Sequence, residues 1–142
     1  MKNRDIYTID MFLDLPPQPV SSAGGLSCRD EIASVMSSAC KGQDRDEITE
    51  KMSDLLGRTI SSSVFNNYMA QSRHDAIPPL DTAIAFDLAT GSSALAAFFA
   101  KKIGAKIVIG KEALDVELGK LERQQYECSQ RIRLLKKAME DL

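Results

Sequence analysis

The feature that most constrains the fold of this chain is a heptad repeat that spans residues 111–142. Two positions of the repeat are almost entirely apolar: Leu114, Leu121, Cys128, Leu135 and Leu142 occupy one, and Leu118, Gln125, Ile132 and Met139 occupy the other. Such a repeat requires one long helix, because only a helix brings residues three and four apart onto the same side. We expect a coiled-coil oligomerisation helix; the alternative is an amphipathic helix folded back on its own domain.

Charges beside this seam indicate how two such helices would pair. In a parallel pair, Glu117 would face the partner's Glu122, and Arg131 would face the partner's Lys136, so both contacts would join like charges. In an antiparallel pair, Glu122 would meet Lys136 twice. Exposed ion pairs contribute only roughly 0.2–1 kcal/mol each, so the sequence weakly favours an antiparallel dimer and leaves higher oligomers open. Gln125 lowers the stability of the seam and helps to fix its register.

Residues 1–26 have a different character. The segment 6–15 is rich in apolar side chains, three prolines follow it, and a run of serine and glycine ends it. Prolines remove backbone donors, and serine and glycine offer little to pack. We therefore expect a flexible arm, whose apolar segment docks either on its own domain, which is favoured, or on a protein partner.

The region between the arm and the heptad repeat, residues 27–104, has helical periodicity throughout. Capping residues, glycines and apolar spacing predict helices from Ser27 to Gly42, from Asp44 or Asp46 to Gly57, from Ser61 or Ser62 to about Gln71, from Leu80 to Thr90 and from Ser92 to Ile103. In the third helix, Val64, Phe65, Tyr68 and Met69 are expected to point inward. The fold class is therefore all-α, with a brief extended piece possible in residues 105–110.

The second and third of these helices carry the pattern of a helix-turn-helix. The motif needs a small residue where the helices cross, a turn residue, and apolar anchors in the second helix. Ser53, Gly57, Ile60, Phe65 and Tyr68 fill these roles in order. Residues 27–104 therefore resemble the small helical DNA-binding domains of phage repressors and regulators, of the lambda-repressor and Cro type. The whole layout also resembles small regulators encoded in prophages, including Mu-like transposable ones.

The third helix also offers the chemistry to read DNA. No carboxylate occurs between Gly57 and Arg73, and an anionic groove favours such a surface. Asparagine and glutamine pair with adenine through two hydrogen bonds, whereas basic residues bind phosphates and position the protein. The candidate DNA-binding residues are Lys51, Arg58, Ser61, Ser62, Ser63, Asn66, Asn67, Gln71 and Arg73. The alternative is that these polar side chains merely face water. The turn departs from the usual motif, because Arg58 and Thr59 lengthen it by about two residues.

Composition and the rare residue types argue against several other classes. A net charge of −2 counts against indiscriminate binding to polyanions. Three widely spaced cysteines and the single His74 give no metal-ligand spacing, no disulfide framework and no catalytic triad, so neither an enzyme nor a cofactor is expected. No apolar run approaches the roughly 20 residues that span a bilayer, and no signal-peptide pattern is present, so we expect a cytoplasmic location.

These observations predict a sequence-specific DNA-binding transcriptional regulator in three parts. Residues 1–26 would be the arm, residues 27–104 the helix-turn-helix domain and residues 111–142 the coiled-coil helix. The competing hypothesis is an adaptor or antirepressor that does not bind DNA and acts through protein contacts of the arm and coiled coil. The acidic balance of the chain favours the adaptor, and the carboxylate-free third helix favours the regulator.

Overall fold

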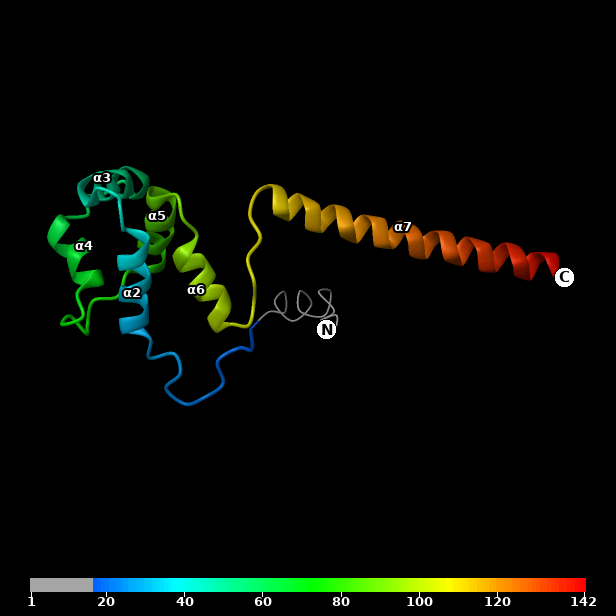
Figure 1. Ribbon diagram of the computed structural model, residues 1–142, viewed down its shortest axis with the longest axis horizontal. Coiled ribbons are helices and arrows are strands. Elements are labelled where there is room, and N and C mark those ends of the chain that lie inside the picture. Colours follow the sequence, from blue (N-terminus) through cyan, green and yellow to red (C-terminus); the bar gives the residue numbers. More distant parts are fainter. Residues whose placement is uncertain (1–16) are drawn as a thin grey trace, which may run out of the picture. The chain divides into compact units, whose positions relative to one another are not determined.

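The computed structural model describes residues 17–142, and this part of the chain contains six helices and no strand (Figure 1). The helices are α2 (Arg29–Ala39), α3 (Arg45–Leu56), α4 (Ser62–Met69), α5 (Leu80–Thr90), α6 (Ala94–Lys102) and α7 (Lys111–Glu140). The all-α class is therefore confirmed for the described residues. The chain divides between Ile107 and Val108 into two compact units. No regular element forms in residues 105–109.

Local signals in the sequence set the ends of several helices. The Asp44 side chain accepts a hydrogen bond from the Asp46 N–H and caps α3, and Ser61 caps α4 by accepting from the Val64 N–H. Gly57 ends α3 in the left-handed conformation, with φ 66°, which few other residues adopt without strain. At the start of α2 the prediction was wrong, because Cys28, not Ser27, is the capping residue and its side chain makes no capping bond.

The first unit is a bundle in which α3 packs mainly against α5, and α2 packs against α4 and α6. The centre of the core is an aromatic pair: Phe65 of α4 and Phe86 of α5 are fully buried, with ring centroids 6.0 Å apart. The buried core cluster consists of Met36, Cys40, Ile48, Met52, Phe65, Met69, Ala85, Phe86, Ala89 and Leu95. Because Phe65 reaches this centre, α4 is fixed to the bundle by the side opposite its polar residues.

Val64 of α4, which was expected to point inward, is exposed instead, and so is Leu55 of α3. Val64 remains 42 % exposed and Leu55 remains 56 % exposed. In each case a neighbouring residue makes the inward contact: Phe65 in α4, and Met52 and Leu56 in α3. Successive residues of a helix point about 100° apart, so only one of two adjacent positions can face a narrow contact.

The described part of the arm is attached to the end of α6. The Val20 N–H donates to the Lys102 carbonyl at 2.9 Å. A Cβ added at Gly104, whose φ is 76°, would fall 2.7 Å from Pro19, so this close approach requires glycine. The chain therefore enters and leaves this unit at one place. The predicted docking segment, residues 6–15, lies outside the described residues.

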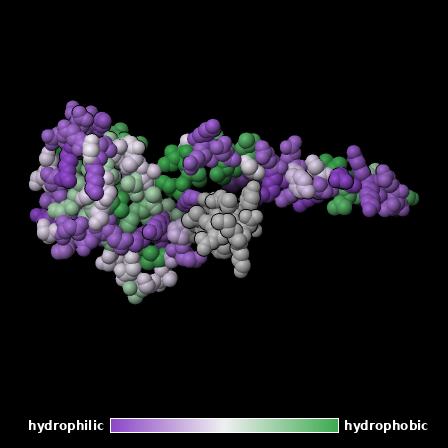
Figure 2. Space-filling view, viewed as in Figure 1, coloured by the Kyte–Doolittle hydropathy of each residue, from purple (hydrophilic) through white to green (hydrophobic). Residues whose placement is uncertain are grey.

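The second unit consists of α7 and the short stretch before it. The helix has 30 residues, and none of them is buried. The seam residues Leu118, Leu121 and Ile132 are about half exposed, and apolar side chains appear at intervals along the helix between polar ones (Figure 2). The predicted long helix is confirmed, and no other residue of this unit covers its apolar seam.

Candidate nucleic-acid interface

The connection between α3 and α4, residues 57–61, is closed by a serine. Ser53 Oγ donates to the Thr49 carbonyl at 2.7 Å and accepts from the Ile60 N–H at 2.9 Å. One small side chain thus joins the last turn of α3 to the residue before the α4 cap. The two additional turn residues, Arg58 and Thr59, are exposed and leave this closure intact. The longer turn therefore still holds α4 at a defined angle.

A buried arginine holds the other end of α4. Arg29, the first residue of α2, donates from Nη2 to the Asn67 carbonyl at 2.7 Å and from Nε to the Ala76 carbonyl at 3.1 Å. Its Nη1 has no hydrogen-bond partner and lies 3.7 Å from the Asp30 carboxylate. Charged donors make strong bonds to carbonyl groups, so Arg29 fixes the last turn of α4 and the loop that follows. This role could not be inferred from the sequence, because both carbonyls are distant from residue 29 along the chain.

The solvent side of α4 carries short polar and amide side chains. Ser63 and Asn66 are exposed and Asn67 is half-buried, and the exposed Val64 lies on the same helix. Hydroxyl and amide groups can bond to base edges, and an apolar side chain can contact the methyl group of thymine. The serine at position 61, by contrast, already uses its hydroxyl as the helix cap.

Asn66 does not stand alone on this surface. Nη1 of Arg45, the first residue of α3, donates to Asn66 Oδ1 at 2.9 Å. The bond leaves the amide NH₂ of Asn66 as the donor group on offer, and it places a guanidinium group at the edge of the α4 surface. Arg45 was not among the predicted site residues, because only the packing of α3 against α4 brings together two residues 21 positions apart.

A carboxylate also reaches this surface. Ser62 Oγ lies 3.5 Å from Asp46 Oδ1. The sequence between Gly57 and Arg73 contains no acidic residue, but α3 supplies one from outside that window. The N-terminal turn of α4 is therefore less favourable to an anionic ligand than the sequence suggested.

The predicted phosphate-binding residues do not form one cluster of free charges. Arg58 donates to Asp81 Oδ2 at 3.0 Å and to Thr82 Oγ1 at 3.3 Å. The side-chain hydrogen bond from Arg58 is the main reason that the pKa of Asp81 is lowered from its usual value. Arg73 lies 3.6 Å from the Asp75 carboxylate, whereas Lys51 is exposed on α3.

Gln71 lies beyond the end of α4, in the turn that follows it. Its Nε2 is 3.5 Å from the Ser34 hydroxyl of α2. Of the other predicted residues, Ser63, Asn66 and Asn67 lie on α4. Ser61 and Ser62 lie at the start of that helix. Gln71 and Arg73 follow it in an exposed loop.

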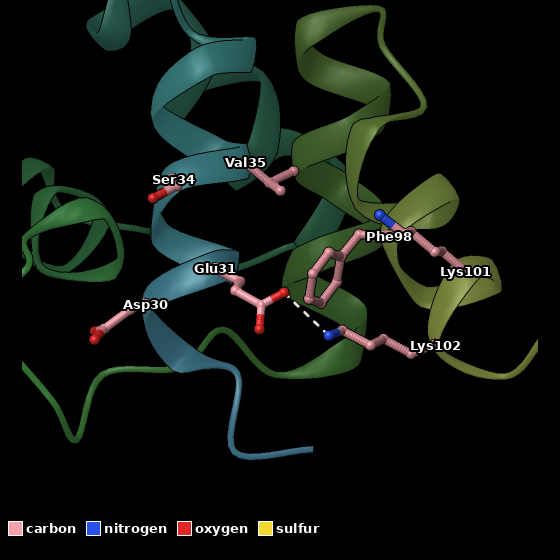
Figure 3. Close-up of a pocket in the computed structure, with 7 residues that line it drawn as sticks. All are labelled: Asp30, Glu31, Ser34, Val35, Phe98, Lys101 and Lys102. Carbon is pink, nitrogen blue, oxygen red and sulfur yellow. Dashed lines mark hydrogen bonds and ion pairs between the residues drawn. The ribbon is translucent and has the colours of Figure 1, made fainter. Parts of the chain in front are cut away.

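A cleft of about 440 Å³ between α2 and α6 is also lined by charged side chains (Figure 3). Lys102 Nζ lies 3.0 Å from the Glu31 carboxylate and 5.2 Å from the centroid of the Phe98 ring. These two partners already satisfy the lysine, which is only 19 % exposed. Lys102 is therefore already paired within the cleft, whereas Lys101, which also lines it, is exposed.

Neither a metal-ligand group nor a membrane-spanning helix is found in the part of the chain described above. Within residues 17–142, no group of histidine, cysteine or acidic side chains is arranged to hold a metal ion. Over the same residues, no helix is both long and apolar enough to cross a membrane. Burial raises the pKa of the Cys40 thiol, which favours its uncharged form.

No family model, no curated protein and no solved structure matches this chain.

Proposed function

We propose that this protein is a sequence-specific DNA-binding transcriptional regulator that places α4 in the major groove. The observation that carries the proposal is the way α4 is held: Phe65 anchors it from below, Ser53 closes its turn and Arg29 fixes its end. A short helix held at three points with amide and hydroxyl groups outward suits direct readout, which needs fixed geometry. The assignment to the phage and prophage type rests on the sequence resemblance alone.

In this proposal the residues have separate tasks. Asn66 and Asn67 read base edges, with Ser61, Ser62 and Ser63 at the start of the helix close to the backbone of the DNA. Lys51, Arg58 and Arg73 bind phosphates, and Arg45 joins them from the edge of the α4 surface. The ion pair between Arg58 and Asp81 is exposed, so it can exchange for a phosphate at small cost.

The exposed seam of α7 supports an oligomer. A single short helix in the groove contacts one half-site, whereas two linked units gain from binding the same duplex together. The seam would join two or more chains and so raise the affinity for paired sites. The complete assembly would thus be two or more reading units joined through their C-terminal helices.

The proposal is tested by selecting binding sites from a random DNA library and measuring mobility shifts with the selected site. Asn66→Ala should lose about 1–3 kcal/mol on the selected site only. Arg58→Ala should weaken binding to all sequences alike and reduce the salt slope by about one. Lys120→Ala, which removes an exposed charge from α7, is the matched control and should change neither.

A second candidate function is an adaptor or antirepressor that acts through protein contacts and does not bind DNA. The net charge of −2 and the carboxylate of Asp46 beside Ser62 favour it. The same library experiment separates the two functions. If no DNA is retained even at low salt, where phosphate contacts are strongest, the regulator proposal is wrong.

A further inference from the structure

The seam of α7 is a helix face that no other residue of its own unit, 108–142, covers. Its aliphatic residues are about half exposed or more, from 49 % at Ile132 to 72 % at Leu114 and Met139. Burying such side chains is worth about 0.8 kcal/mol for each CH₂ group, and a lone amphipathic helix forgoes this gain. The face therefore fits a second helix with the same spacing, and the chain itself supplies one in each further copy.

We propose that α7 pairs with α7 of a second copy, antiparallel and in one register. In an antiparallel pair each residue of one heptad position faces a residue of the other position. The proposed layers are Leu114 with the partner's Met139, Leu118 with the partner's Leu135, Leu121 with the partner's Ile132, and Gln125 with the partner's Cys128. Each layer occurs twice.

The register follows from the two residues of the seam that are not aliphatic. Gln125 and Cys128 face each other in this arrangement, so each of the remaining layers joins two aliphatic side chains. A shift of one heptad in either direction would place Gln125 against Leu135 or Leu121, and it would leave end residues without a partner. An unpaired amide against leucine is costly, because its polar groups lose water without gaining a hydrogen bond.

Charges on either side of the seam favour the antiparallel direction independently. The charged flanking residues in the first half of the helix, Asp115, Glu117 and Glu122, are all acidic. Those in the second half, Arg131 and Lys136, are basic. An antiparallel pair sets the acidic half of each helix beside the basic half of the other, whereas a parallel pair joins like charges.

This register replaces the ion pair that the sequence predicted, between Glu122 and Lys136, with another. With the aliphatic layers matched, Lys136 lies beside the partner's Asp115 and one heptad away from the partner's Glu122. An exposed ion pair contributes little free energy, so the separation of Lys136 from the partner's Glu122 costs little. The packing of the seam, not the ion pair, therefore decides the register.

The arrangement has a consequence that rests on the proposed function. The 30 residues of α7 rise by about 1.5 Å each, so its length is roughly 45 Å. In an antiparallel pair the two helix starts, to which the N-terminal units are joined, lie at opposite ends. The pairing would therefore set the points at which the two reading units are joined to α7 roughly 45 Å apart.

Cysteine cross-linking tests the pairing without any DNA. Two full-length chains are prepared in a background of Cys28→Ser, Cys40→Ala and Cys128→Ala, one with Leu114→Cys and the other with Met139→Cys. Mild oxidation of the mixture should yield a covalent dimer that contains one chain of each kind. A sample of one variant alone should stay uncross-linked. In a dimer of two identical chains, the two introduced thiols, one in each chain, would lie roughly 37 Å apart along the axis.

Other outcomes overturn the proposal. Cross-linking of either chain with itself shows a parallel pair, and a dimer by light scattering without any cross-link shows another register. A monomeric chain at tens of micromolar excludes the pairing altogether. Leu118→Cys with Leu135→Cys repeats the test one layer further in, where fraying of the ends plays no part. A failure here leaves the DNA mobility shift untouched, so the two proposals can fail separately.

Discussion

The two units of this chain use the same material in opposite ways. In the first unit, apolar stripes of short helices are turned inward, and Phe65 and Phe86 have no exposed surface. In α7, an equally regular stripe stays outside, and Leu121 is 55 % exposed. A stripe becomes core where several helices of one chain can surround it, and an interface where only one helix is available. The first unit should therefore be stable by itself, whereas the proposed pairing makes the order of α7 depend on protein concentration.

The strongest test of this contrast is a truncation in the core. Phe86→Ala should destabilise the first unit by about 3–5 kcal/mol, because it removes the ring that Phe65 packs against and leaves a cavity. Hydrogen exchange measured by mass spectrometry reports the loss, since peptides from α3 to α5 should exchange faster while those from α7 do not change. Phe99→Ala, at a residue 59 % exposed in the same unit, is the matched control and should cost less than about 1 kcal/mol. Equal effects of the two changes would contradict the core described above.

A truncation in the seam should give the opposite result. If α7 pairs as proposed, Leu121→Ala should cost about 2 kcal/mol per copy, all of it in association. Exchange in α7 should become faster and depend more steeply on protein concentration, while peptides of the first unit stay as they were. Leu134→Ala, at an exposed leucine that lies outside the seam, is the control. A loss of protection in the first unit would show that α7 packs on its own chain.

The smallest expected effect concerns pH and the Arg58–Asp81 pair. Hydrogen bonding from Arg58 lowers the pKa of Asp81 in the folded state, so the pair stabilises the fold above the usual pKa of a carboxyl group. This contribution should be lost as the pH falls through the lowered pKa, and it should be small because both side chains are about half exposed. Denaturant unfolding between neutral and acid pH should show a slightly weaker acid dependence in Asp81→Asn. An unchanged acid dependence in Asp81→Asn would contradict the pairing.

Much of the fold could be predicted because its signals are local. Asp44 and Ser61 cap helices by bonding to residues two or three positions ahead, and Gly57 ends a helix through its own backbone angle. The heptad repeat likewise defines α7 within its own sequence. Exposure of Val64 could not be predicted in this way, because the contact that selects Phe65 over its neighbour is made by α5.

The candidate interface was less predictable for the same reason. Arg29, Arg45 and Asp46 all act on α4 from other helices, across 16 to 38 residues of sequence. Their positions depend on how α2, α3 and α4 pack together, and no local pattern in the sequence specifies that packing. The sequence identified which residue types α4 carries, and the packing determines which of them are engaged.

The hydrogen bond from Val20 to Lys102 brings the beginning and the end of the segment 20–102 together. The Val20 N–H lies 2.9 Å from the Lys102 carbonyl oxygen, and Pro19 lies close to Gly104. A unit of this form can be spliced whole into a surface loop of another protein, because the host chain need only open by the width of one backbone contact. It should equally accept new ends elsewhere, with a short glycine linker joining positions 20 and 102. The module that presents α4 would then be portable, and its partners could be changed by grafting it onto hosts of known symmetry.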